Sequence, residues 1–244
     1  MLLVKFIFFL LAATFFSLLF GKIDFLAENK HFMKKVARFC MTYVRAGQDT
    51  IVSSLITIFY LASIVCGLLV FSLVYEINIF KYLVIDKEYV IYIFIGICAE
   101  LTIANLLVSF LSGCFKQIDF RLALVHTKWA DRLLNLPAFL MPIIPAVAGL
   151  IEEIFFRGLL LIILVEHYAF IGPFWIIAIV SILFTVEQVI QTESKVQAIS
   201  MAVVSLTISV IGCLLVIQTG SILPAIIARS CFGIYYFAGT RRPA

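Results

Sequence analysis

Two adjacent carboxylates and an arginine stand together in the segment 149–158, Gly-Leu-Ile-Glu-Glu-Ile-Phe-Phe-Arg-Gly. On a helix, Glu153 and Arg157 are four residues apart and share a face, so they can form an ion pair. Glu152 lies about 100° further round the helix and must meet a different neighbour. One paired and one freer carboxylate suit acid–base chemistry on water. A buried ion pair that fixes the helix register would explain Glu153 and Arg157 without catalysis, but it leaves Glu152 unexplained.

Three more ionisable side chains, Glu100, Glu187 and Arg229, fall within otherwise apolar stretches. An ionised group near the centre of a bilayer costs about 2.5–3.5 kcal/mol on insertion scales, so each group needs a partner or a water-filled cavity. With the first cluster, they make four carboxylates and two arginines. That is more than structure alone usually requires, and we expect some of them to be functional.

The composition explains why these charges are unusual. The chain has 244 residues, of which 64% are hydrophobic and 13% charged, whereas soluble domains are about 45–50% apolar and about 25% charged. Lipid must therefore cover much of the apolar surface, and the length fits a single domain. Six scattered cysteines without a C-x-x-C pair argue against a disulfide or zinc framework.

Seven apolar stretches have lengths mostly near the roughly 20 residues that a spanning helix needs. They are residues 2–20, 51–75, 89–113, 138–164, 171–190, 198–217 and 222–239. The predicted fold class is an all-α polytopic membrane protein with about seven transmembrane helices. We divide the chain into an N-terminal anchor with a basic segment (1–50), accessory helices (51–137), a core (138–239) and a cytoplasmic tail (240–244).

The distribution of basic residues predicts the orientation in the membrane. In a seven-span arrangement, thirteen Lys and Arg fall on one side, against Lys5, Lys81 and Lys87 on the other. This places the amino terminus outside and the carboxyl terminus in the cytoplasm; an eighth span or a re-entrant segment would change it. The first stretch is interpreted as a retained anchor rather than a signal peptide, because no A-x-A site precedes Gly21.

Residues 22–50 are too charged to cross the membrane, and their apolar positions recur at about helical spacing. The pattern is typical of a basic amphipathic helix on the cytoplasmic surface, near anionic headgroups. A solvated linker rich in positive charge explains the composition equally well, so both interpretations remain open.

The motif Glu152-Glu153-x-x-x-Arg157-Gly158 resembles the first motif of the CPBP family. This family of intramembrane glutamate proteases includes CAAX prenyl endopeptidases and bacteriocin-processing and immunity proteins. Its second motif is F-x-x-x-H, and its third is H-x-x-x-N, often just after G-S-(I/L)-x-P-A. The resemblance implies a helical core in which the first glutamate activates a water and histidines hold the water and the oxyanion. It implies no metal or other cofactor.

The order and spacing of the later motifs also match. Phe184-Thr-Val-Glu187-Gln188 stands at the second motif, and the run that begins Gly220-Ser221-Ile-Leu-Pro-Ala stands at the third. The resemblance covers residues 138–239.

Three positions depart from the family pattern. Gln188 and Arg229 occupy the histidine positions of motifs two and three, and Gly233 occupies the asparagine position. Gln188 can donate a hydrogen bond but cannot transfer a proton near neutral pH. Arg229 is permanently charged, so it can stabilise an oxyanion or clamp Glu152 or Glu187. The chain's histidines, His31, His126 and His167, fall outside the motif positions. These departures favour lost or altered proteolysis.

Two functional hypotheses remain, with a channel or transporter as a weaker third. The first is an endopeptidase with Glu152 as base, Glu153 and Arg157 as an orienting pair, and Gln188 with Arg229 as oxyanion donors. Its substrate would be a lipid-modified carboxyl terminus or a small secreted peptide. The second is a non-catalytic scaffold, immunity or regulatory protein that binds a peptide, lipid or partner transmembrane helix. Nothing in the sequence suggests nucleic-acid binding.

Overall fold

A computed structural model describes residues 2–28, 30–43, 47–125, 127–137 and 139–238, and every regular element in these ranges is helical. The predicted all-α fold class is therefore confirmed, while the last predicted domain, 240–244, lies outside the described residues. The longer helices are α1 (Leu2–Glu28), α2 (Lys30–Met41), α3 (Gln48–Tyr75), α4 (Tyr89–Cys114), α7 (Leu140–Phe155), α9 (Pro173–Ile190), α10 (Lys195–Thr219) and α11 (Leu223–Ala238). The shorter ones are α5 (Phe120–Val125), α6 (Lys128–Leu134), α8 (Ile162–His167), the 3₁₀ turns η1 (Ile79–Tyr82) and η3 (Ala169–Ile171), and the π-helix η2 (Phe156–Leu161).

Among the described residues, five helices are long and apolar enough to cross a membrane. They are α1, α3, α4, α9 and α10, and they coincide with five of the seven predicted stretches. The stretch 138–164 is divided among α7, η2 and α8, and the stretch 222–239 forms α11, which has 16 residues and carries Arg229. The number of spans, predicted as seven, is not fixed by this architecture.

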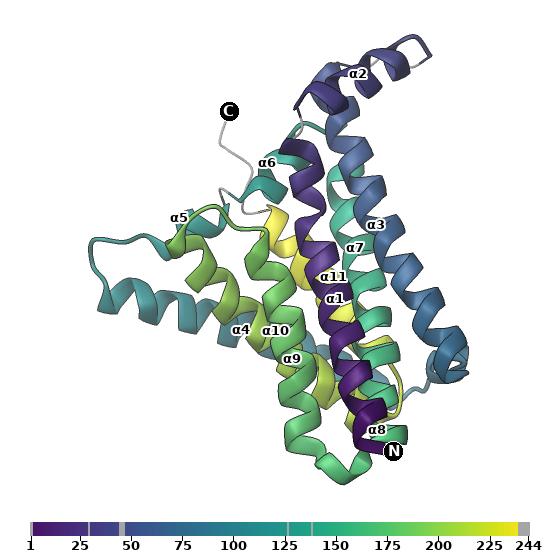
Figure 1. The fold of residues 1–244 in the computed structure, drawn as a ribbon. Coiled ribbons are helices and arrows are strands. Elements are labelled where there is room, and N and C mark those ends of the chain that lie inside the picture. The colour runs from purple at the N-terminus through teal and green to yellow at the C-terminus, as the bar shows by residue number, and fades with distance from the viewer. Residues whose placement is uncertain (1, 29, 44–46, 126, 138, 239–244) are drawn as a thin grey trace.

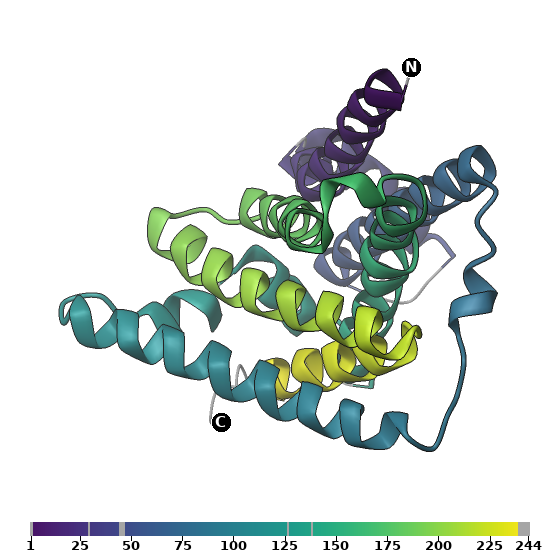
Figure 2. The ribbon, with the colours of Figure 1, turned by 90° about the horizontal axis from the view of Figure 1, so that it is seen from below.

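Helices α1, α3 and α7 run in nearly the same direction, whereas α4 lies across that direction (Figure 1). Seen from below, α4, α10 and α11 run side by side across one half of the molecule, and each of the three packs against the other two (Figure 2). Helix α9 packs against both α10 and α1, and α7 packs against α11 and α3. As a result, α7 lies between α3, from the N-terminal half of the chain, and α11, from the C-terminal half.

The N-terminal segment differs from the prediction at one boundary. Helix α1 continues past residue 20 to Glu28, so the first part of the segment 22–50 extends the anchor helix instead of leaving it. Gly21 lies within α1 at a close contact: a Cβ at this position would lie 2.8 Å from the backbone oxygen of Glu187 on α9. Aromatic rings join α1 to α7, where the ring centroids of Phe20 and Phe155 are 5.0 Å apart.

The turn between α10 and α11 places the third motif. Gly220 ends α10 with φ of +67°, a left-handed conformation that glycine adopts without strain. The buried Ser221 hydroxyl contacts the backbone oxygens of Tyr82 and Val84, at 3.1 and 2.9 Å, and the Ile222 amide donates to the Tyr82 oxygen. The start of α11 is thereby attached to the loop after η1, which sets the position of Arg229 two turns later.

Candidate functional site

The predicted ion pair on α7 and η2 is present and fully enclosed. Arg157 Nη1 lies 3.0 Å from Glu153 Oε1, and the two side chains are 0% and 1% exposed. Within the described part of the chain, neither group has a well-aligned hydrogen bond, so the contact is an ion pair held by packing. The Arg157 guanidinium also lies 4.5 Å from the centroid of the Phe184 ring, a distance at which cation–π attraction adds to the Coulomb term.

The pair sits where the helix changes from α to π geometry. Short π-helical segments are rare and often occur at functional sites. A glycine of α10 makes room for the charged groups: a Cβ at Gly212 would lie 3.2 Å from Arg157 Nε and 3.3 Å from Glu153 Oε2. The ion pair is therefore sealed between α7, α9 and α10, and its position favours a structural or orienting role.

Glu152 points away from that pair, as the helical geometry predicts. Its Oε2 lies 3.0 Å from Arg229 Nη2 of α11, and its Oε1 accepts a hydrogen bond of 2.6 Å from the Tyr60 hydroxyl of α3. The two side chains of the ion pair are 14% and 6% exposed. Of the two partners predicted for Arg229, the structure selects Glu152. Both oxygens of this carboxylate are thus held by protein donors.

Glu187 joins the same network from α9. The Tyr60 hydroxyl lies 3.1 Å from Glu187 Oε1, while Gln188 Nε2 and Gln191 Nε2 each donate to a carboxylate oxygen of Glu187 at 2.6 Å. Gln188 therefore orients Glu187 in addition to lining the site. Tyr60 and Gln191 were not predicted. The four-residue spacing of Glu187 and Gln191 was a usable signal, but nothing in the sequence distinguishes Tyr60 from other aromatic residues in apolar stretches.

A cavity of about 70 Å³ lies against these groups. Glu152, Gln188, Arg229 and Gly233 all line it, together with Tyr60 and an apolar wall from α10 and α11. Its lining includes residues of the last turns of α9 and α11. A space of this size holds several water molecules, since one needs about 10–15 Å³ on the same measure. Glu153 and Arg157 lie behind Glu152 and do not line the cavity.

Glu100 is also fully buried, at 0% exposure on α4. Neither of its oxygens has a hydrogen-bond partner among the described residues. A buried carboxylate without a partner is costly, and Glu100 makes four buried carboxyl groups against the two arginines. Its place outside the hydrogen-bonded network was not foreseen.

The histidines do not complete the site. His167 ends α8, is exposed, and has its ring 5.6 Å from that of Tyr75, away from the cavity. His126 and the side chain of His31 lie outside the described residues. The positions that match the family's histidines are therefore those of Gln188 and Arg229, both of which reach the cavity.

The chain is similar to a known protein family over part of its length. Residues 134–235 match the family described as "Type II CAAX prenyl endopeptidase Rce1-like". The segment contains α7 to α10, most of α11 and every motif residue, and the match confirms the resemblance to CPBP proteins. No curated protein and no solved structure shows a significant match. The C-terminal part of the chain is thus similar to CAAX proteases over residues 134–235, and α1 to α5 precede this part.

Proposed function

We propose that this chain is a membrane protein whose Rce1-like domain binds a peptide segment in the cavity beside Glu152 without hydrolysing it. The proposal rests on the contact of 3.0 Å between Arg229 Nη2 and Glu152 Oε2. By resemblance, Glu152 is the residue that would activate water, and Arg229 stands in the place of a histidine.

This contact opposes catalysis by a simple energetic argument. If Glu152 accepted a proton from water, Arg229 would lose its counter-charge in a mostly buried site. Neutralising one member of a buried ion pair costs about 3–5 kcal/mol, which would raise the barrier to water attack. Arg229 itself stays protonated, and the Gln188 amide does not titrate. The two groups at the histidine positions can stabilise negative charge, but neither can relay a proton.

The cavity supports binding. It combines the polar groups of Glu152, Gln188 and Arg229 with an apolar wall that includes Val204, Ile208 and Phe232. A space of about 70 Å³ suits one apolar side chain of a bound peptide, since pockets that enclose larger ligands measure about 300–1,000 Å³. Glu152 and Arg229 already form an ion pair with each other. A bound peptide can therefore contact them without any transfer of a proton.

A second candidate is an altered endopeptidase, and one observation favours it. Glu152, Gln188 and Arg229 face the same cavity, and it has room for water. In this alternative, Glu152 is the base, Glu153 with Arg157 orients it, and Gln188 with Arg229 stabilises the oxyanion. Lipid-modified carboxyl termini and small secreted peptides are the substrate classes that the resemblance suggests.

One experiment on purified protein in liposomes separates the two candidates. Prenylated carboxyl-terminal peptides and short secreted-peptide precursors, each fluorescently labelled, are tested for binding by anisotropy and for cleavage by mass spectrometry. We expect binding without cleavage in the native protein, and no cleavage in Glu152→Gln. We also expect Val204→Trp, which fills the cavity, to weaken binding about tenfold or more, equal to at least about 1.4 kcal/mol. Leu206→Trp, on the lipid-facing side of the same helix, serves as the matched control.

Three other outcomes of this experiment would contradict the proposal or explain the absence of cleavage. Cleavage that vanishes in Glu152→Gln, in protein shown to be folded, would establish the endopeptidase and remove the proposal of binding without hydrolysis. Gain of cleavage when Gln188→His and Arg229→His are combined in folded protein would show that these two positions block catalysis in the native chain. Binding that is equal in Val204→Trp and Leu206→Trp would place the ligand elsewhere and contradict the proposed cavity.

A further inference from the structure

Helix α2 has no part in the site, yet its position is constrained by the two helices around it. The apolar span of α1 ends at Ile23, and α2 begins at Lys30 and is followed by α3 from Gln48. Both neighbours are candidate membrane spans, so α2 must stay within a few residues of the membrane surface. It also packs directly on α3.

Exposure distinguishes a protein-facing side of α2 from an outer side. Met33 and Ala37 are 2% and 0% exposed and face the protein. Phe39 is 65% exposed, and its ring makes an edge contact with that of Tyr43, which follows the helix and is 77% exposed. Lys35 and Arg38 are exposed too, and Lys35 shares a helix face with Phe39, four residues later. The helix thus buries one apolar stripe in the protein and leaves an aromatic strip beside basic residues.

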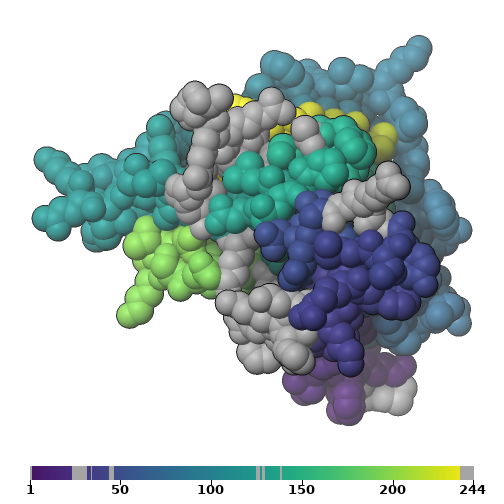
Figure 3. Space-filling view, turned by 90° about the horizontal axis from the view of Figure 1, so that it is seen from above, coloured from purple at the N-terminus to yellow at the C-terminus, as the bar shows by residue number. Residues whose placement is uncertain are grey.

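The upper face of the molecule leaves this helix open. Figure 3 looks down on that end, and α2, in dark blue, forms part of the outer surface there. The segment 22–45 that contains it has six Lys or Arg against Asp24 and Glu28. Clusters of four to eight basic residues next to a membrane span are typical of sites for anionic lipid.

We propose that α2 lies in the membrane interface and binds the headgroups of anionic phospholipids. Lys35 and Arg38 would contact the phosphates, while Phe39 and Tyr43 would enter the boundary between headgroups and acyl chains. A solvated linker, the other interpretation of this segment, needs no aromatic strip next to its charges. The exposed rings therefore favour a lipid surface as the occupant. The inference does not depend on what the cavity beside Glu152 does.

The test compares full-length protein in nanodiscs of phosphatidylcholine alone with nanodiscs that also contain phosphatidylglycerol. Hydrogen–deuterium exchange of peptides covering 32–43 is the readout, because it reports this helix alone. Each basic residue near an anionic surface contributes about 1 kcal/mol, so two contacts should slow exchange about tenfold or more in the anionic nanodiscs. High salt should reduce the difference, since it screens exposed charges.

Variants identify the residues responsible. Lys35→Gln with Arg38→Gln should remove the lipid-dependent difference, whereas Lys116→Gln with Lys195→Gln, which removes two exposed charges elsewhere, should keep it. Phe39→Ser should increase exchange in both lipid compositions. Exchange in α10 serves as the check that each variant is folded. Equal exchange of 32–43 in the two nanodiscs, or a difference that survives the α2 double variant, would overturn the proposal.

Discussion

The Tyr60 hydroxyl connects two buried carboxyl groups although it carries a single proton. It lies 2.6 Å from a Glu152 oxygen and 3.1 Å from a Glu187 oxygen. A hydroxyl donates one hydrogen bond at a time, so the second contact requires a proton on the carboxyl group or a shared bond. Tyr60 thereby connects α3 to both α7 and α9. Without its hydroxyl group, both of these contacts would be lost.

Replacing Tyr60 by Phe tests that connection. We expect a loss of about 1–3 kcal/mol in the free energy of unfolding, because buried acceptors on Glu152 and Glu187 lose a donor without gaining water. Denaturant titration in detergent gives the value. Tyr235→Phe, at an exposed tyrosine of α11, is the matched control and should change stability by less than about 0.5 kcal/mol. Equal effects of the two variants would show that the Tyr60 hydroxyl contributes nothing specific.

The enclosed pair of Glu153 and Arg157 allows a double-mutant cycle. Arg157→Met should cost about 3–5 kcal/mol, because it leaves the Glu153 carboxylate in a sealed site without its counter-charge. Adding Glu153→Gln should recover a large part of this loss, which the same titration measures. Lys87→Met, at an exposed cation before α4, controls for the loss of a positive charge. No recovery in the double variant would mean that packing of the Arg157 side chain, rather than its charge, is the source of stability.

At the scale of single residues, the sequence predicts contacts within one helix better than contacts between helices. The pair Glu153 and Arg157 follows from a spacing of four residues. The partner of Arg229 could be narrowed only to Glu152 or Glu187, because the choice depends on how α11 crosses α7. Tyr60 could not be identified at all: its role comes from the placement of α3 beside α7 and α9, which no local pattern encodes.

The same distinction holds at the scale of elements. Apolar stretches predict which segments are helical, because a backbone in lipid has no water to bond with. Its N–H and C=O groups must therefore form hydrogen bonds within the segment, as they do in a helix. They do not predict helix ends: α1 runs on to Glu28, and α3 begins at Gln48. The π-helix over Phe156–Leu161 was not predicted either, since an apolar stretch predicts a helix but not its hydrogen-bond pattern.

Gly21→Ala tests how α1 is attached to the rest of the molecule. The added Cβ would lie 2.8 Å from the backbone oxygen of Glu187, and backbone atoms cannot move aside as a flexible side chain can. We expect a loss of about 1–3 kcal/mol and faster hydrogen exchange in α1. Gly113→Ala is the matched control, because nothing lies within 4 Å of its added Cβ. There the same change should be neutral or stabilising by up to about 1 kcal/mol, as expected for replacing glycine in a helix. Tolerance of both variants would mean that α1 is only loosely docked on α9.

At the scale of the whole molecule, the site is shared between the two parts of the chain. The Rce1-like segment 134–235 supplies Glu152, Glu187 and Arg229. The preceding helices supply Tyr60, which bonds to Glu152 and Glu187, and the buried carboxyl group of Glu100. The predicted domain division at residue 138 is not tested by this structure. The contacts nevertheless indicate that the C-terminal segment alone would carry an incomplete network.

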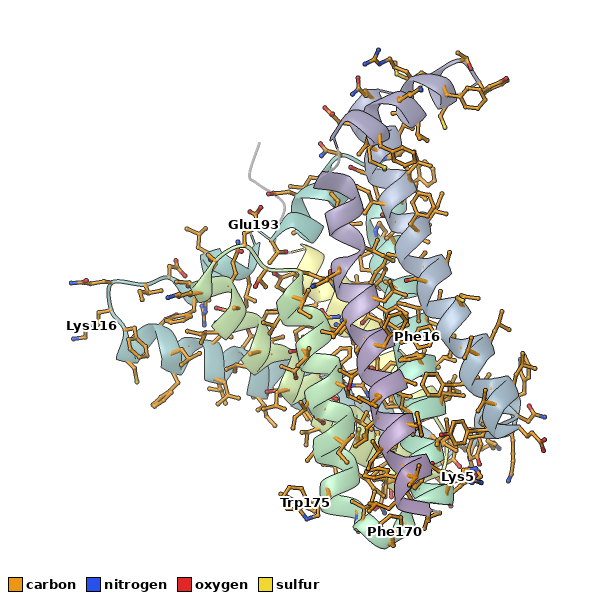
Figure 4. All side chains as sticks on the ribbon, in the orientation of Figure 1. Lys5, Phe16, Lys116, Phe170, Trp175 and Glu193 are labelled. Carbon is orange, nitrogen blue, oxygen red and sulfur yellow. The ribbon has the colours of Figure 1, made fainter. Side chains whose placement is uncertain are left out.

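The orientation of the molecule in the membrane follows from its charges and remains a prediction. Lys5, Phe170 and Trp175 lie at the lower end of the structure, while Glu193 lies in its upper half and Lys116 at the left edge (Figure 4). Aromatic residues gather at both membrane interfaces, so they do not fix the orientation, but basic loops favour the cytoplasm. In sealed membrane vesicles of known sidedness, an epitope tag inserted after Lys116 should be cleaved by protease added on the cytoplasmic side, and one inserted after Asp86 should be protected from it. The reverse pattern would contradict the predicted orientation; cleavage or protection of both tags together would instead show that α4 does not cross the membrane.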